Sequence, residues 1–144
     1  MSLQLYFPKA SELLLPFFTI PISAGAAKDI DQIVEWMNLD EFVRSNNFSN
    51  YYLRVSGDSM IDVGIYDGAI LVVERREYAV NGDVVVAEIN GEFTVKEYKQ
   101  ERQKLYLVPA NPNYKKRQVN KKDTFNIWGV VTFVLQKPQK IIRH

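Results

Sequence analysis

The segment Val55–Val73, VSGDSMIDVGIYDGAILVV, raises the question whether Ser59 only shapes a Gly-Asp-Ser turn or also attacks a substrate. A serine hydroxyl becomes an effective nucleophile when a neighbouring base takes its proton. The chain has no cysteine, and its one histidine, His144, is the last residue, where chains usually fray. A Ser-His-Asp triad is therefore disfavoured. If Ser59 is a nucleophile, another base must activate it.

Lys96 is the candidate base, and a hairpin at Asn90-Gly91 predicts its place. A two-residue turn there pairs Ile89 with Glu92, Ala87 with Thr94 and Val85 with Lys96. Alternation along the strand puts Thr94, Lys96 and Tyr98 on one face. The alternative is an edge-strand lysine that discourages aggregation, or one that reaches to water. To act as a base, the lysine must be buried, because burial lowers its pKa from about 10.4 toward about 7 or 8.

The turn itself can supply a second catalytic element. Gly57 lets the chain present the backbone N–H groups of Asp58 and Ser59 to a developing oxyanion. The motif differs from the nucleophile elbow of α/β-hydrolases, because Ile61 occupies the second glycine position. The lack of cysteine removes the usual zinc-thiolate sites, and we expect neither a metal nor a cofactor.

The elements that position these residues are predicted to be mostly strands. Six apolar or alternating runs are separated by Asp-Gly, Asn-Gly and Asn-Pro turns: residues 51–56, 69–74, 83–89, 92–98, 104–110 and 125–137. They favour a mainly β fold of twisted antiparallel sheets, partly closed like a barrel. One or two short helical turns are expected in residues 28–46, with Asn38 and Glu41 spaced as a capping box. We expect an N-terminal arm with this helical segment in residues 1–45 and a β-rich catalytic domain in 46–144.

The charge of the chain is divided between its two parts. Residues 1–95 carry six Lys or Arg and fourteen Asp or Glu, a balance of −8, and residues 96–144 carry twelve and three, a balance of +9. The basic stretch Tyr114–Lys122 can contact nucleic acid or an acidic partner, but a solvated loop is the favoured interpretation. We find no helix-turn-helix, zinc-finger or RNP-like pattern, so sequence-specific DNA binding is not expected.

The apolar stretch between Glu12 and Lys28 is too short, and too interrupted by prolines, to span a bilayer. Residues 24–26, Ala-Gly-Ala, also resemble a signal-peptide cleavage site, although Glu12 and the prolines spoil the apolar region before it. The absence of cysteine is compatible with the reducing cytoplasm, where we expect the protein.

Four motifs together resemble the LexA/UmuD group of self-cleaving Ser-Lys peptidases, the S24 type. They are SGDSMIDVGIYDGAILVV, NGDVVVAEINGEFTVKEY, LVPANPNY and WGVV, and the match runs from Ile22 to Val134. The resemblance implies a LexA C-terminal-type fold with Ser59 as the nucleophile and Lys96 as the general base. It also implies that the chain cuts its own Ala24-Gly25 bond, for which the alternative is an ordinary flexible linker.

The 24 residues before Gly25 leave no room for a DNA-binding domain, so the UmuD branch is the expected one. That resemblance implies a homodimer in the SOS response to DNA damage, with cleavage promoted by a RecA filament. The shortened form would then join a UmuC-type translesion polymerase, with the polymerase sliding clamp as a further partner. Two alternatives remain: the self-cleaving part of a LexA-like or phage repressor, and a non-catalytic dimeric module that binds the polymerase.

Overall fold

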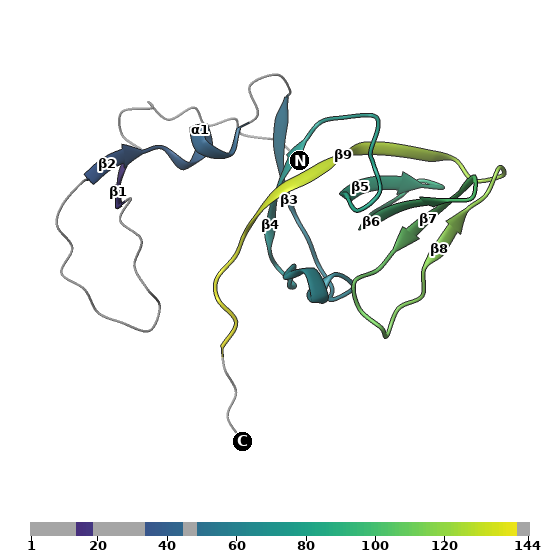
Figure 1. The fold of residues 1–144 in the computed structure, drawn as a ribbon. Coiled ribbons are helices and arrows are strands. Elements are labelled where there is room, and N and C mark those ends of the chain that lie inside the picture. The colour runs from purple at the N-terminus through teal and green to yellow at the C-terminus, as the bar shows by residue number, and fades with distance from the viewer. Residues whose placement is uncertain (1–13, 19–33, 45–48, 141–144) are drawn as a thin grey trace. The chain divides into compact units, whose positions relative to one another are not determined.

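The computed structural model describes residues 14–18, 34–44 and 49–140. By its internal contacts the chain divides into two units, Met1–Arg44 and Ser45–His144 (Figure 1). The predicted cleavage site, Ala24-Gly25, lies outside the described residues.

The described residues of the first unit form a short antiparallel pair and a helix. Strand β1 (Leu15–Phe18) pairs with β2 (Val34–Met37), and α1 (Leu39–Val43) follows. Asn38 is the N-cap, because the Glu41 N–H donates to Asn38 Oδ1 at 3.2 Å, and this is one half of the predicted capping box. The short helix α1 agrees with the helical turns expected in residues 28–46, whereas the strand at Val34–Met37 was not predicted. There the backbone groups pair with β1, and such pairing overrides local helix preference.

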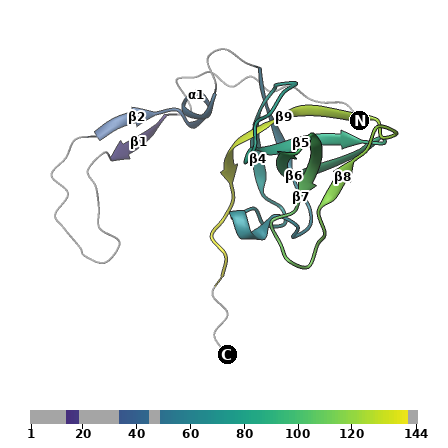
Figure 2. The ribbon, with the colours of Figure 1, turned by 45° about the vertical axis from the view of Figure 1, so that its right-hand side comes forward.

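The second unit is a seven-stranded sheet in which every neighbouring pair is antiparallel, so the predicted fold class is confirmed. Its strand order is β3-β4-β9-β5-β6-β7-β8. The strands are β3 (Asn50–Arg54), β4 (Ile70–Glu74), β5 (Val84–Ile89), β6 (Glu92–Glu101), β7 (Lys104–Val108), β8 (Arg117–Val119) and β9 (Phe125–Leu135). Figures 1 and 2 show a strongly twisted sheet in which the long β9 runs beside β4 and β5.

All six predicted strands are present, and β8 is an additional one. It lies in the basic stretch that we interpreted as a solvated loop, and it pairs Arg117 with Leu107 and Val119 with Leu105. The three residues of β8 lie between lysines and show little of the pattern of a strand. They form one because the edge of β7 has backbone groups free to pair with them. The loop interpretation was therefore wrong for Arg117–Val119.

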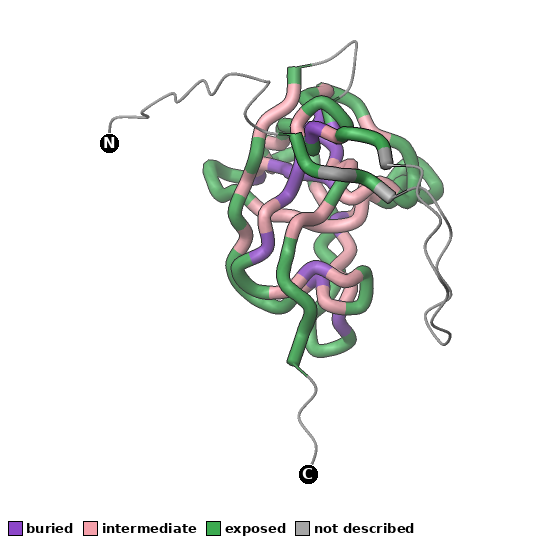
Figure 3. The backbone as a smooth tube through the Cα atoms, turned by 90° about the vertical axis from the view of Figure 1, so that its left-hand side faces the viewer, coloured by how far each residue is buried: buried purple, intermediate pink, exposed green. Residues whose placement is uncertain are grey.

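The sheet is packed on both of its faces along β5. Val86 belongs to one buried cluster with Met60, Ile65, Ala69, Leu71 and Val73. The alternate residues Val85 and Ala87 belong to a second cluster with Leu107 and Val130. A strand buried on both faces reads as a continuous apolar run, which explains VVVA at residues 84–87. Figure 3 shows the buried positions in the interior of the described part of the chain, with exposed positions around them.

Gly129, in the WGVV motif, allows β9 to approach β4 closely. A Cβ at this position would lie 2.5 Å from Val73 Cγ1 and 2.6 Å from Glu74 O, closer than real contacts allow. The register of β9 also shifts against each neighbour, which indicates two bulges. These bulges bend the long strand so that β4 and β5 both pair with it.

Candidate active site

Ser59 lies in the turn that leads from β3 to the short 3-10 helix η2 (Ile61–Val63). Gly57 has φ +93°, a conformation that favours glycine, and its N–H donates to Asp67 Oδ1 at 2.8 Å. Met60, next to the serine, is buried in the core cluster. The turn is therefore attached to the rest of the fold on both sides of Ser59.

Lys96 lies on β6, and the predicted hairpin register is confirmed. Val85 pairs with Lys96, and the other two predicted pairs are also present. Asn90 and Gly91 have φ +52° and +82°, as a type I′ turn requires. Strand β6 pairs with β7 only along Glu97–Glu101, so at Lys96 it is paired with β5 alone and the position of Lys96 at a strand edge fits the alternative interpretation.

The fold brings the two predicted residues together. Lys96 Nζ lies 2.9 Å from Ser59 Oγ, 2.9 Å from Thr94 Oγ1 and 3.0 Å from the Val95 carbonyl oxygen. These are hydrogen-bond distances, and the serine and lysine are 37 positions apart in the chain. The amine is thus held in one place by two oxygens of its own strand and faces the hydroxyl with its third contact.

The surroundings of Lys96 disfavour its charged form. Burial lowers the pKa of the Lys96 amine below its usual value of 10.5. No carboxylate in the described ranges lies within ion-pairing distance of Nζ to oppose this effect. A neutral lysine has a free lone pair, so it can accept a proton from the neighbouring hydroxyl.

A cleft of about 230 Å³ opens beside the Ser59-Lys96 pair. Its lining is part polar and part apolar. The polar side chains besides the pair itself are Arg54, Ser56 and Thr94, and the apolar ones are Leu53, Val55, Met60, Ile65, Val86, Phe93 and Val95. The apolar side chains contribute to the desolvation of the lysine. They also offer a place for a small, extended apolar peptide segment.

The backbone N–H groups of Asp58 and Ser59 are unoccupied by any acceptor among the described residues. They remain available as hydrogen-bond donors next to Ser59 Oγ. An oxyanion that forms at a carbonyl attacked by this oxygen needs such donors.

Two features of the site were missed as functional by the sequence interpretation. Thr94 was placed on the face of Lys96, yet its contact with Nζ was not foreseen, although spacing of two along a strand was the available signal. The loop at Asn111 contacts the serine turn from 53 positions away, and no local pattern indicates that contact.

Within the described residues, no cluster of three or more His, Cys, Asp or Glu is arranged to hold a metal ion. None of their helices is long and apolar enough to cross a membrane.

The profile of the family described as Peptidase S24-like matches residues 16–132, which include both Ser59 and Lys96. The chain belongs to the peptidase S24-like family. This confirms the resemblance at the level of the family, and the UmuD branch within it stays a prediction.

Relatives named LexA repressor are similar to this chain. The protein from Leptospira interrogans is 37% identical over 112 residues, which are 69% of this chain and 55% of the relative. The protein from Clostridium acetobutylicum is 40% identical over 117 residues, 72% of this chain and 56% of the relative. The protein from Pseudomonas chlororaphis is 48% identical over 75 residues, 52% of this chain and 37% of the relative. The chain spans about half the length of the relatives from Leptospira interrogans and Clostridium acetobutylicum. It spans a smaller part of the relative from Pseudomonas chlororaphis.

Proposed function

We propose that this protein is a self-cleaving serine peptidase in which Ser59 is the nucleophile and Lys96 is the general base. The observation that carries the proposal is the 2.9 Å contact between Lys96 Nζ and Ser59 Oγ beside a cleft. Membership of the peptidase S24-like family supports the same chemistry. The alternative explanation is that Lys96 is a surface lysine and Ser59 a turn residue, both with structural roles only. This alternative does not explain why the Lys96 amine is half-buried with no ion pair among the described residues.

The substrate that we propose is the protein's own Ala24-Gly25 bond. A small residue before the bond and a glycine after it allow an extended backbone to enter a narrow cleft. The mostly apolar stretch FFTIPI, which precedes the bond, suits the apolar side chains of the lining.

The reaction has two steps. Neutral Lys96 takes the proton of Ser59, Oγ attacks the carbonyl carbon of Ala24, and the N–H groups of Asp58 and Ser59 bind the oxyanion. The C–N bond to Gly25 breaks as its nitrogen receives the proton from Lys96, which leaves an ester on Ser59. Water then attacks the ester, gives its proton to Lys96, and frees the Ala24 carboxyl group and the Ser59 hydroxyl.

We further propose that the protein is a homodimeric switch of the DNA-damage response. A RecA filament would promote cleavage, and the shortened form would serve as the accessory subunit of a UmuC-type polymerase, with the sliding clamp as a possible contact. Family membership supports the switch, and the polymerase partnership rests on the motif resemblance.

A LexA-like repressor function is the second candidate, and the names of the relatives favour it. Both candidates share the cleavage chemistry and differ in what the protein binds. Pull-down with a UmuC-type polymerase supports the first candidate. Binding of operator DNA by the native gene product supports the second.

The cleavage test is mass spectrometry of purified protein after incubation at about pH 10. At this pH a lysine with a lowered pKa is neutral in most molecules. We expect fragments of residues 1–24 and 25–144, and no fragments from Ser59→Ala or Lys96→Ala. Lys99→Ala is the matched control, because Lys99 is an exposed lysine of the same strand. A wild-type chain that stays intact under every condition would exclude the peptidase and favour a non-catalytic binding module.

A further inference from the structure

The loop before β8 packs against the turn that carries Ser59. The Asp62 N–H donates to the Ala110 carbonyl oxygen at 2.8 Å, and the Ala110 N–H contacts Met60 Sδ at 3.3 Å. These two contacts attach the loop to the chain just after Ser59. They involve the backbone of Ala110 and do not depend on its neighbour, Asn111.

Asn111 adds a contact with the other side of the nucleophile. Its Nδ2 donates to the Asp58 carbonyl oxygen at 2.8 Å, while its Oδ1 accepts from the Asn113 N–H at 3.0 Å. The side chain is buried, with 4% of the residue exposed. Its orientation is set by its partners, because a carbonyl needs the amide nitrogen and an N–H needs the amide oxygen. A buried amide that is satisfied at both ends is held rigidly.

The bond to Asp58 fixes a peptide plane that matters for catalysis. The Asp58 carbonyl and the Ser59 N–H belong to the same planar trans peptide, so they point in opposite directions. A donor that holds the carbonyl on one side therefore directs the Ser59 N–H to the other side. We infer that Asn111 is a positioning residue that aims the Ser59 N–H at the oxyanion of the proposed reaction. This inference rests on the proposed function.

The other contacts of Asp58 cannot replace this bond. The Ile61 N–H also approaches the Asp58 carbonyl, but at 3.4 Å, beyond the usual range of such bonds. Tyr114 donates its hydroxyl to the Asp58 carboxylate, which holds the side chain and leaves the peptide plane free to rotate. The short bond from the buried Asn111 is the one that sets the direction of the plane. It also polarises the peptide, which strengthens the opposite N–H as a donor.

Two variants test the inference. Asn111→Asp keeps the oxygen that accepts from Asn113 and removes the donor to Asp58. Asn111→Ala removes both bonds without adding a charge, and the two Ala110 contacts are expected to keep the loop in place. The matched controls are Asn126→Asp and Asn126→Ala, because Asn126 is an exposed asparagine on β9 outside the cleft.

The first measurement is the rate of self-cleavage between pH 7 and pH 10.5. We expect both Asn111 variants to lower the alkaline plateau about 10- to 100-fold, since misdirected oxyanion donors cost rates of this order. Asn111→Ala should leave the pH midpoint of cleavage unchanged, because the surroundings of Lys96 are not altered. A merely structural loss would instead appear as a shifted midpoint or as an unfolded protein by circular dichroism.

The second measurement separates oxyanion binding from substrate binding, and it uses peptides with the sequence of residues 18–24, FTIPISA. A peptide aldehyde forms a reversible tetrahedral adduct with Ser59, and the corresponding amide does not. We expect the aldehyde to bind the Asn111 variants more weakly by about the same factor as the rate, while the amide binds equally.

Wild-type cleavage together with an Asn111→Ala plateau within about twofold of wild type contradicts the inference alone. Equal aldehyde affinity of wild type and variant contradicts it as well, even if one variant fails to fold and only the other is measured. A wild-type protein that never cleaves contradicts the proposed function, and with it this inference.

Discussion

Lys96 and Asp123 both have a lowered pKa, but the causes and the consequences are opposite. Burial lowers the pKa of the Lys96 amine, so the charged form of this residue is disfavoured. At Asp123 the hydrogen bond from the Asn120 N–H is the main cause, followed by the bond from the Asn90 side chain, and these favour the charged form. The fold therefore works against one charge and in favour of the other.

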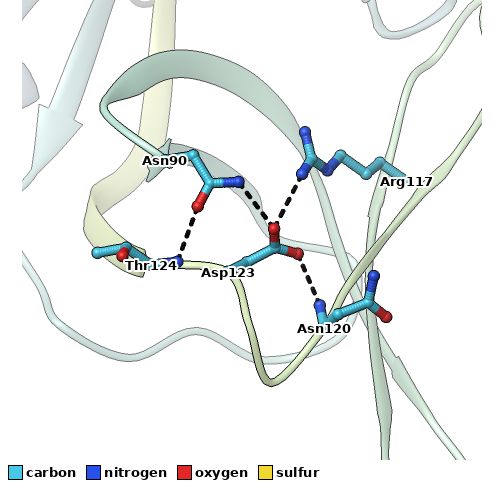
Figure 4. Close-up of polar contacts among 5 residues, drawn as sticks. All are labelled: Asn90, Arg117, Asn120, Asp123 and Thr124. Atoms are coloured by element: carbon cyan, nitrogen blue, oxygen red, sulfur yellow. Dashed lines mark hydrogen bonds and ion pairs between the residues drawn. The ribbon is translucent and has the colours of Figure 1, made fainter.

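Figure 4 shows the contacts around Asp123. Asn120 N donates to Oδ2 at 2.8 Å, and Asn90 Nδ2 and Arg117 donate to Oδ1 at 2.7 and 3.1 Å. Asn90 also accepts from the Thr124 N–H at 2.9 Å, so the network ties the β5–β6 turn to the loop before β9. A charge that is satisfied in this way holds structure together.

The oxygens that contact Lys96 Nζ are all neutral, and apolar side chains form part of the cleft beside it. Such an environment costs stability while the lysine is charged, and it makes the neutral amine accessible as a base. The comparison separates a residue kept for stability from one kept for chemistry. Substitutions at Lys96 and Asp123 test this difference, because the first should change cleavage and the second stability.

The largest effect is expected for Lys96→Met, which replaces the amine with an apolar side chain of similar length. Cleavage should fall by about 10²- to 10⁴-fold, as loss of a general base does. The free energy of unfolding, measured with urea at about pH 6, should be unchanged or higher, because the variant no longer buries a charge. Lys99→Met is the control and should leave both quantities nearly unchanged. A strongly destabilised Lys96→Met protein would show that the lysine is structural.

The next effect is expected for Asp123→Asn, and it should be confined to stability. The variant loses the charge that the Asn120 and Asn90 donors stabilise, so Tm should fall by roughly 5 °C in calorimetry. Cleavage of the folded variant should stay within about twofold of wild type, because the two sites share no contact. Asp62→Asn, at an exposed aspartate of η2, is the control for Tm. Loss of cleavage in folded Asp123→Asn would mean that the two regions are coupled.

The smallest effects are expected in the pH dependence of stability. The unfolded state binds more protons than the folded state between each lowered pKa and the ordinary one, so stability rises with pH in both windows. The contribution of Asp123 is fully present above its ordinary pKa of 3.8 and is lost as pH falls through the lowered value. The cost of charged Lys96 is present below its lowered pKa and disappears as pH rises toward 10.5.

Urea unfolding across pH tests these windows. The stability difference between wild type and Asp123→Asn should shrink only in acid, and that between wild type and Lys96→Met only in alkali. A difference that is constant across the alkaline window would contradict a lowered pKa of Lys96.

Local signals predicted much of the fold. Asn90-Gly91 tolerates positive φ, and from that turn alone the pairing of Val85 with Lys96 followed. The Asn38 cap was likewise visible as a pattern of two residues. The strands at Val34–Met37 and Arg117–Val119 were not predicted, because each exists through a partner strand that the local sequence does not contain.

The sequence by itself determined which groups are available for chemistry: a serine in a glycine turn, a lysine on a predicted strand, and neither a cysteine nor an internal histidine. Only the tertiary structure decided that the Lys96 amine is partly buried, that its Nζ meets Ser59 Oγ, and that Asn111 holds the peptide before the serine. The physical reason is range. Turn conformation and strand alternation act over a few residues, whereas burial and hydrogen bonding at the site depend on segments 37 and 53 positions apart.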